Sequence, residues 1–203
     1  MKQVFELKYP DICTLQAKRY KLMDNSVLFT TRRLKIIQYA LPLLAEIYEL
    51  YSDSDVIKYT TTNGRAKTPQ ELTKGIEVYT QMYANTHNAR GKWLIADAVT
   101  NKVVGYVGLF YIDEIKQTEI SYALMSKYRG NGFAAEAALG MAHYAFTKLQ
   151  LPAVCALIGP DNIPSQNVAQ RIGMVYRGKN VNVWGFDFKV FTLTDKSIKK
   201  AAN

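Results

Sequence analysis

The pattern of apolar and polar residues along the chain predicts a mixture of helices and strands. Apolar residues recur with helical spacing in several segments, and one of these begins at a helix-start signal with Thr68 as N-cap, Pro69 in the first turn and Glu71 three residues on. The predicted helices span residues 40–60, 68–83, 133–149 and 162–173. Runs rich in β-branched and aromatic residues, bounded by turn-forming residues, predict strands. The predicted strands span residues 27–38, 93–99, 103–112, 119–125, 154–158, 174–177 and 183–193.

The order of these elements indicates the fold class. A strand and two helices are followed by a run of antiparallel strands, and then by a helix, a strand, a helix and the final strands. This order is typical of an α+β (mixed α/β) fold and not of a doubly wound parallel sheet. We therefore expect one domain over residues 26–203, with a twisted, mostly antiparallel sheet of six or seven strands and helices on both faces. Residues 1–25 are expected to be an N-terminal extension of unknown structure.

Length and composition agree with a single soluble domain. The chain has 203 residues, of which 48% are apolar and 21% charged, and this length suffices to bury a full core. The first residues lack the apolar core of a secretory signal, and no uncharged apolar run approaches the ~18 residues that a membrane span needs. We therefore expect a cytoplasmic protein without a membrane partner.

The formal net charge of +9 is spread along the chain. A diffuse excess of positive charge suits an anionic ligand or an acidic macromolecular surface. It differs from the clustered basic stripe of a DNA-binding protein, and no aromatic-and-basic motif appears, so direct nucleic-acid recognition is not predicted. The two cysteines and two histidines are far apart, and this predicts neither a disulfide framework nor a metal site.

The segment RGNGFAAEA, residues 129–137, follows a predicted strand and opens a predicted helix. Gly130 and Gly132 lack Cβ atoms, so the backbone can wrap closely around an oxyanion, and Arg129 adds a cation beside it. The unpaired N–H groups at the start of the helix favour the same ligand. The segment therefore predicts a phosphate-binding loop; the alternative is that the two glycines only form a tight strand-to-helix turn.

Two common nucleotide-binding motifs do not fit this loop. The dinucleotide fingerprint requires a third glycine where Ala135 stands, and a carboxylate that residues 149–156 do not supply. The Walker motif requires G-K-[ST], which is absent. Arg129, Gly132 and Ala134 instead fill the pattern [QR]-x-x-G-x-[GA] in register. In this pattern the loop resembles the pyrophosphate loop of the GNAT superfamily of N-acetyltransferases, which use acetyl-coenzyme A (acetyl-CoA).

The resemblance extends over roughly residues 27–195. EISYALMSKYRGNGFAAEA resembles the strand, loop and helix of the RimJ/RimL-type branch, which includes the ribosomal-protein alanine and serine N-acetyltransferases, and NIPSQNVAQRIGM resembles the N-x-x-S element of that branch. TTRRLKI, SDSDVIKY and WGFDFKVFTLT also stand where the branch has similar segments. The resemblance implies a centrally splayed sheet and direct transfer of an acetyl group from acetyl-CoA to an amine, with no covalent enzyme intermediate.

The resemblance also implies which residues hold acetyl-CoA. Backbone N–H groups of the glycine loop would hold the diphosphate, and the splayed strand would pair with the pantetheine arm much as an added peptide pairs with a sheet edge. A backbone N–H near Leu124 would face the thioester oxygen, and Asn162 would contact the arm. The cofactor-binding residues implied are Tyr122, Ala123, Leu124, Arg129, Gly130, Asn131, Gly132, Phe133, Ala134 and Asn162.

The catalytic residues are less fully determined. Many members of the superfamily carry a general-acid tyrosine seven residues after the equivalent of Asn162, but Ala169 stands there and excludes such an acid. The RimJ/RimL-type branch has a serine where Ser165 stands, and its hydroxyl could steady or protonate the departing sulfur, or only cap its helix. Glu119 corresponds to a carboxylate common in the branch; it could accept the amine proton directly or through water, or be an exposed carboxylate at a strand end.

The remaining chemistry-bearing residues are assigned structural roles. Cys155 lies inside an apolar strand and is expected in the core. Glu136, in the first turn of a helix, would favour the helix dipole without a further role. His87 falls in a polar loop and His143 in a helix, and neither is expected to act in catalysis.

The sequence leaves the acceptor open. The first hypothesis is a protein N-terminus, which a wide, shallow cleft would favour, and the second is a small amine such as a polyamine, amino acid or antibiotic, which a closed acidic pocket would favour. The third hypothesis is a non-catalytic acyl-CoA-binding module, because the sequence does not identify the general base. A homodimer is compatible with the sequence, which does not determine the oligomeric state.

Overall fold

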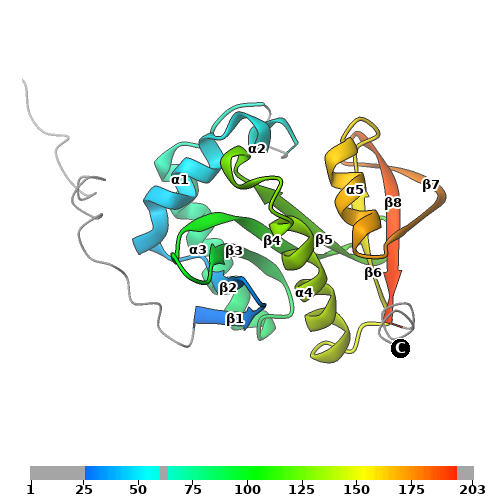
Figure 1. Ribbon diagram of the computed structural model, residues 1–203, viewed down its shortest axis with the longest axis horizontal. Helices are drawn as coiled ribbons and strands as arrows, with labels where there is room; N and C mark the ends of the chain where they lie inside the picture. Colours follow the sequence, from blue (N-terminus) through cyan, green and yellow to red (C-terminus); the bar gives the residue numbers. More distant parts are fainter. Residues whose placement is uncertain (1–25, 60–63, 196–203) are drawn as a thin grey trace, which may run out of the picture.

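The computed structural model describes residues 26–59 and 64–195, so the extension expected over residues 1–25 lies outside the described residues. This part of the chain forms an eight-stranded sheet in the order β1-β2-β3-β4-β5-β6-β8-β7 (Figure 1). The strands are β1 (Val27–Thr30), β2 (Leu34–Gln38), β3 (Gly91–Asp97), β4 (Val103–Ile112), β5 (Gln117–Leu124), β6 (Ala153–Ile158), β7 (Val175–Val183) and β8 (Phe186–Thr194). The helices are the 3₁₀ turns η3 (Leu41–Leu43) and η4 (Ser126–Tyr128), and α1 (Leu44–Ser52), α2 (Ser54–Lys58), α3 (Pro69–Thr86), α4 (Phe133–Thr147) and α5 (Ile163–Arg171).

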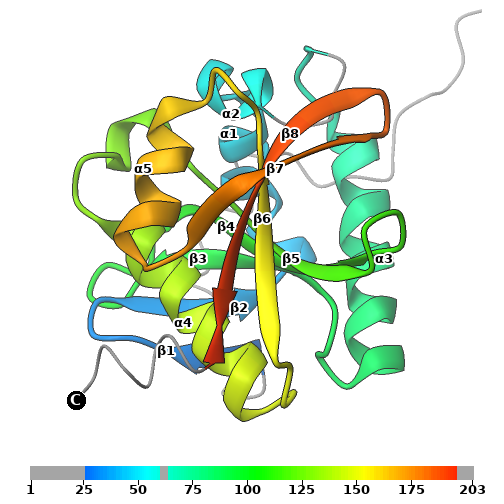
Figure 2. The same ribbon diagram turned by 90° about the vertical axis from the view of Figure 1, so that its right-hand side faces the viewer.

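The sheet divides at its centre, between β5 and β6. These two strands are parallel, whereas the other neighbouring pairs are antiparallel. Within the described ranges, β5 and β6 share one register pair, Glu119 with Cys155. Figure 1 shows β6, β7 and β8 with α5 standing apart from β1–β5, and Figure 2 shows β6 crossing in front of β5. The predicted mixed α/β fold with a mostly antiparallel sheet is confirmed.

Helices cover both faces of the sheet, and each face has its own buried cluster. Met141 of α4 and Ala169 of α5 belong to the cluster on one face. Leu50 of α1 and Ile76 of α3 belong to the cluster on the other face, with Leu94 of β3. Burial of apolar side chains on both faces holds the two parts of the sheet in place around the central gap. Across the described ranges, every helix is too short or too polar to cross a membrane.

The opening segment differs from its prediction. Residues 27–38 form a hairpin, β1 and β2, in place of one strand, and this raises the sheet from the predicted six or seven strands to eight. Thr31 closes the turn: its N–H donates to the Leu34 carbonyl at 2.9 Å, and its Oγ1 accepts from the Leu34 N–H at 3.1 Å. Glu136 of α4 then accepts from the Thr31 hydroxyl at 2.7 Å and from the Arg33 N–H at 2.8 Å. A partner more than 100 residues away thus holds the turn.

The predicted helix over residues 40–60 is divided at Asp53. The Oδ1 atom of Asp53 accepts hydrogen bonds from the N–H groups of Asp55 and Val56 at 3.0 and 3.3 Å, so Asp53 caps a new helix, α2. Its Oδ2 accepts from the N–H of Ser126 at 2.8 Å. An N-cap aspartate satisfies the unpaired first amides of a helix, and here it also ties α2 to the end of β5.

Candidate active site

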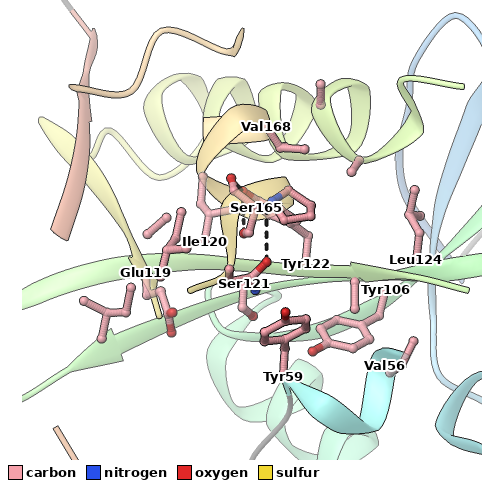
Figure 3. Close-up of a pocket in the computed structure, with 18 of the residues that line it drawn as sticks. Val56, Tyr59, Tyr106, Glu119, Ile120, Ser121, Tyr122, Leu124, Ser165 and Val168 are labelled. Atoms are coloured by element: carbon pink, nitrogen blue, oxygen red, sulfur yellow. Dashed lines mark hydrogen bonds between the residues drawn. The ribbon is translucent and has the colours of Figure 1, made fainter. Parts of the chain in front are cut away.

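A cavity of about 690 Å³ opens where β5 and β6 separate. Successive side chains of a strand point to opposite faces, so Glu119 and Ser121 lie on one face of β5 and Ile120 and Tyr122 on the other (Figure 3). The cavity therefore reaches both faces of the sheet through the gap. The predicted site residues line it, with the exception of Asn131.

The glycine loop presents unpaired amides to the cavity. Gly130 and Gly132 adopt left-handed φ angles of 80° and 76°, which residues with a Cβ atom avoid. Gly132 is the N-cap of α4, and no side chain of the described residues caps this helix. In the described part of the chain, the first amide of α4 with a protein acceptor is that of Glu136, which donates to the Gly132 carbonyl at 3.0 Å. The amides before it lie at the positive end of the helix, and this arrangement suits an anion.

Arg129 braces the loop instead of standing free beside it. Its Nε and Nη2 donate to the Leu124 carbonyl at 3.2 and 3.1 Å, and its Nη1 forms an ion pair with Asp55 at 2.6 Å. The backbone N–H of Arg129 donates to the Ser126 carbonyl at 3.2 Å. Both the charge and the amide of Arg129 are therefore already engaged, and the positive potential of the loop comes mainly from the amides that follow it.

The end of β5 offers a backbone donor to the gap. The N–H of Met125 donates to the Val104 carbonyl of β4 at 3.0 Å. Because a trans peptide places its C=O opposite its N–H, the Leu124 carbonyl points away from β4. In a strand, the N–H and C=O of one residue point to the same side, so the Leu124 N–H also points away from β4, toward the gap. This is the amide that the sequence resemblance places near the thioester oxygen.

Ser165 pairs with Tyr122 and is not the cap of its helix. Asn162 caps α5, since its Oδ1 accepts from the Ser165 N–H at 3.2 Å. The Ser165 hydroxyl donates to the Tyr122 hydroxyl at 3.1 Å, and the Tyr122 hydroxyl donates to the Ser165 carbonyl at 2.9 Å (Figure 3). Burial raises the pKa of Tyr122 to about 12, so this phenol stays protonated at neutral pH. Two hydroxyl groups therefore meet on the α5 side of the gap, and the capping alternative for Ser165 does not hold.

Glu119 lies at the point where β5 and β6 part, and it is not an exposed carboxylate. Its side chain is mostly buried in the cavity wall and accepts a hydrogen bond from the Leu157 N–H. Burial raises the pKa of Glu119 to about 7, because it outweighs the lowering by Leu157 and by the Lys92 charge. A carboxyl with this pKa is the kind of group that accepts and releases protons near neutral pH.

Cys155 lies beside Glu119 in the register of the sheet but is fully buried. Burial, together with the Glu119 charge, raises the pKa of the Cys155 thiol to about 12. The thiolate is the reactive form of cysteine, so this residue is a core residue and not a nucleophile. Ala169, which stands where the sequence resemblance would place a general-acid tyrosine, is fully buried in the core as well.

Comparison with known families agrees with this geometry. The model of the acetyltransferase (GNAT) domain matches residues 33–175, which include the glycine loop, Glu119 and Ser165. The chain belongs to the GNAT acetyltransferase family. The sequence-based assignment to this family, and to an N-acetyltransferase, is confirmed.

Two proteins of Bacillus subtilis (strain 168) share moderate identity with the chain. The uncharacterized N-acetyltransferase YnaD is 26% identical over 149 residues, covering 73% of this chain and 83% of YnaD. The uncharacterized protein YkkB is 34% identical over 113 residues, covering 53% of this chain. That match spans 65% of YkkB, slightly less than two thirds of its length.

Solved acetyltransferase structures have the same fold at low identity. A GNAT-family acetyltransferase from Bacillus anthracis has a TM-score of 0.69 at 23% identity, covering 82% of this chain and 98% of that one. A spermidine N-acetyltransferase from Vibrio cholerae, solved with CoA and spermine, has a TM-score of 0.66 at 20% identity, covering 82% and 98%. RimL, a ribosomal L7/L12 alpha-N-protein acetyltransferase solved with coenzyme A, has a TM-score of 0.69 at 14% identity, covering 83% and 97%.

Two residues of this GNAT site were not identified from the sequence. Arg33 holds the glycine loop from outside: it donates to the Asn131 carbonyl at 2.9 Å, forms an ion pair with Glu136 at 2.6 Å and lies over the Phe133 ring at 4.8 Å. Glu136 therefore does more than favour the helix dipole. The other residue is Lys92, which lines the cavity on the face opposite Ser165. Only the TTRRLKI segment gave a signal for Arg33, and no pattern in the sequence pointed to Lys92.

Proposed function

We propose that the protein transfers an acetyl group from acetyl-CoA directly to a primary amine, with Glu119 as the general base. The observation that carries the proposal is the position of Glu119. A mostly buried carboxyl with a pKa of about 7 lies at the gap between β5 and β6, in the same cavity as the unpaired amides of the glycine loop and the Ser165 hydroxyl. A base, an anion-binding loop and a hydroxyl donor are the groups that this reaction requires.

The cavity suits acetyl-CoA along its length. The amides of residues 130–135 would hold the diphosphate, and Asn131, whose side chain donates to the Tyr128 and Arg129 carbonyls at 3.3 Å each, fixes the shape of the loop. The separated edge of β5, from Tyr122 to Leu124, would pair with the amides of the pantetheine arm. The thioester would then lie at the gap, near the Leu124 N–H, which would stabilise the oxyanion as the carbonyl carbon is attacked.

The proton and the leaving group would move on opposite faces of β5. The amine nitrogen attacks the thioester carbon, the C–N bond forms, and the nitrogen loses a proton to the Glu119 carboxylate, which later releases it to water. The C–S bond breaks and the sulfur leaves as a thiolate, a tolerable leaving group because thiols have a pKa of about 8.5. The Ser165 hydroxyl, which can rotate about its Cβ–Oγ bond, would donate to this sulfur, and the thiolate then takes a proton from water.

The lining of the cavity favours the N-terminal amine of a polypeptide over a polyamine. The charged residues of the lining are Asp55, Lys92, Glu119, Arg129 and Arg171. Asp55 is neutralised by Arg129, so among the described residues of this lining Glu119 is the one carboxylate without an ion pair. A polyamine carries several positive charges and needs several carboxylates, whereas a peptide N-terminus brings one amine to one base. The diffuse positive charge of the chain would help approach to an acidic macromolecular surface.

An acceptor panel tests the proposed function. The protein is mixed with acetyl-CoA and with peptides, amino acids or polyamines, and the released thiol and the N-acetylated product are measured together. We expect release of thiol that depends on the amine, in equal amounts with the acetylated product. If the protein binds CoA tightly and yet acetylates none of the amines, the proposed acetyltransferase function is wrong and the protein is an acyl-CoA-binding module.

The hydroxyl pair supplies a prediction of its own. We expect Ser165→Ala to lower kcat by about tenfold, since a hydrogen bond to a developing charge is lost, and to leave the dissociation constant of CoA nearly unchanged. Tyr122→Phe removes the acceptor of the Ser165 hydrogen bond, so the two substitutions together should cost less than the product of their separate effects. Steady-state kinetics measures kcat for each variant, and calorimetric titration measures the dissociation constant of CoA. A wild-type rate in Ser165→Ala would leave the hydroxyl without a role in turnover.

A further inference from the structure

Lys92 of β3 places a positive charge in the wall of the cavity. It stands in a row across three strands, paired with Gly108 of β4, which is paired in turn with Ser121 of β5. Side chains in such a row lie on the same face, so Lys92 shares the face of Ser121 and of Glu119, two residues away. A Cβ atom at Gly108 would lie 2.6 Å from the Ser121 hydroxyl, so only glycine leaves space between the two ends of the row.

Aromatic rings surround the Lys92 ammonium where a carboxylate would be expected. Its Nζ lies 4.1 Å from the centre of the Tyr106 ring, 5.7 Å from that of Tyr51 and 6.0 Å from that of Tyr79, and it donates to the Tyr51 hydroxyl at 3.3 Å. Among the described residues, no carboxylate lies within ion-pair distance of it. Burial works to lower the pKa of Lys92, but the oxygens of Tyr51 and Tyr106 raise it above its ordinary value, so the group is charged at neutral pH.

Among the described residues, the mostly buried Lys92 ammonium bonds the hydroxyl groups of Tyr51 and Tyr79, and this leaves one of its donors unfilled. An ammonium has three N–H donors, and burying a charge without a compensating partner is costly. The side chain lines the cavity, so the unfilled donor has access to a molecule bound there. Glu119 is close enough for the Lys92 charge to lower its pKa, which places the proton acceptor and this cation in one binding space.

We propose that Lys92 selects acceptors that carry a carboxylate close to the amine, with the carboxylate at Lys92 and the amine at Glu119. The inference rests on the proposed function and names the class of acceptor for that same site. One face of β5 would then hold both charged ends of the acceptor, each opposite a group of the other sign. The carboxylate has two sources, an acidic side chain near a peptide N-terminus or the carboxylate of a free amino acid.

Equilibrium binding tests the inference separately from turnover. Two pairs of ligands are titrated into the wild-type protein saturated with CoA, which carries no acetyl group and so allows no reaction. One pair is two peptides that differ only by Glu or Gln at the second residue. The other pair is a free amino acid and its carboxamide. We expect the acidic member of one pair to bind about tenfold or more tightly, since a hydrogen bond between charged groups is formed. The peptide pair and the amino-acid pair distinguish the two sources. Equal affinity within both pairs would overturn the inference.

Substitution of Lys92 connects the preference to this residue. Lys92→Met keeps the length of the side chain and removes its charge, and it should abolish the preference for the acidic member, whereas Lys92→Arg should retain part of it. Lys148→Met removes the same charge from the exposed C-terminal end of α4 and should leave the preference unchanged. A preference that survives in a folded Lys92→Met variant would also overturn the inference. If acidic acceptors bind by this pattern but are not acetylated, the proposed function fails and the assignment of Lys92 stands.

Discussion

Replacing Glu119 by glutamine is expected to lower kcat by about 10²- to 10⁴-fold, the range that general-base catalysis contributes. Glutamine keeps the size of the side chain and removes its ability to accept a proton. The amine could then lose its proton only to water that reaches the gap. Because Glu119 lies away from the glycine loop, the dissociation constant of CoA should remain close to that of the wild-type protein. Thiol release at saturating acceptor and calorimetric CoA titration measure the two quantities.

A matched control is available on the same hairpin. Glu114 lies exposed in the turn between β4 and β5, and Glu114→Gln removes an equal charge without touching the cavity. The Glu114 variant should retain the wild-type kcat. A Glu119→Gln variant that turns over as fast as the Glu114 variant would rule out Glu119 as the base.

Replacing Gly132 by leucine is expected to weaken CoA binding by about 100-fold or more. Gly132 has a φ of 76°, which a residue with a Cβ atom adopts only under strain, so the loop would move to another conformation. The amides of Phe133 and Ala134 would then no longer converge on one anion. Each lost hydrogen bond to a charged phosphate costs about 1.5–3 kcal/mol, and two such losses exceed a factor of 100.

Gly178 provides the control for this experiment. It has a φ of 78°, and a Cβ atom placed there would meet nothing within 4 Å. It lies in the interior of β7 and does not line the cavity. Gly178→Leu should therefore lower the melting temperature through similar strain, with CoA affinity unchanged. Tight CoA binding by a folded Gly132→Leu variant would show that the loop amides do not hold the diphosphate.

Much of the fold followed from local signals in the sequence. Thr68 and Glu71 form the capping box that the T-P-Q-E run predicts, and α3 begins where expected. The strand β4 has the predicted bounds, because its apolar run ends at turn residues on both sides. Signals of this kind depend on neighbours along the chain, and such neighbours are visible in a single sequence.

Where the sequence-based predictions were wrong, the cause is a contact with a residue far away along the chain. The turn at Thr31 depends on Glu136 of α4, and the break at Asp53 is fixed in part by Ser126 after β5. Neither partner could be assigned from spacing in the sequence. The helical periodicity of residues 40–60 continues through Asp53, so the pattern alone gives one helix where the structure has two.

In the candidate site, too, the part formed by neighbours along the chain could be predicted and the part formed by distant residues could not. The glycine loop lies within one short segment, and its residues could be named from the R-x-x-G-x-A pattern. The role of Glu119 depends on burial between two strands that are distant in sequence, and a single sequence does not show how deeply a carboxyl is buried. Lys92 joins the site only through the registers of β3 with β4 and of β4 with β5. No periodicity along β3 distinguishes it from a solvent-exposed lysine.

The pH dependence of kcat/KM, measured for the wild-type protein and for Glu119→Gln with the same acceptor, tests the central role of Glu119 most directly. Burial raises the Glu119 pKa to about 7, so the carboxyl is protonated and unable to act as a base at lower pH. The wild-type profile should therefore rise as the pH increases through about 7, and this limb should be absent from the variant. Ionisation of the acceptor amine contributes equally to both profiles. Two profiles of identical shape would contradict the account.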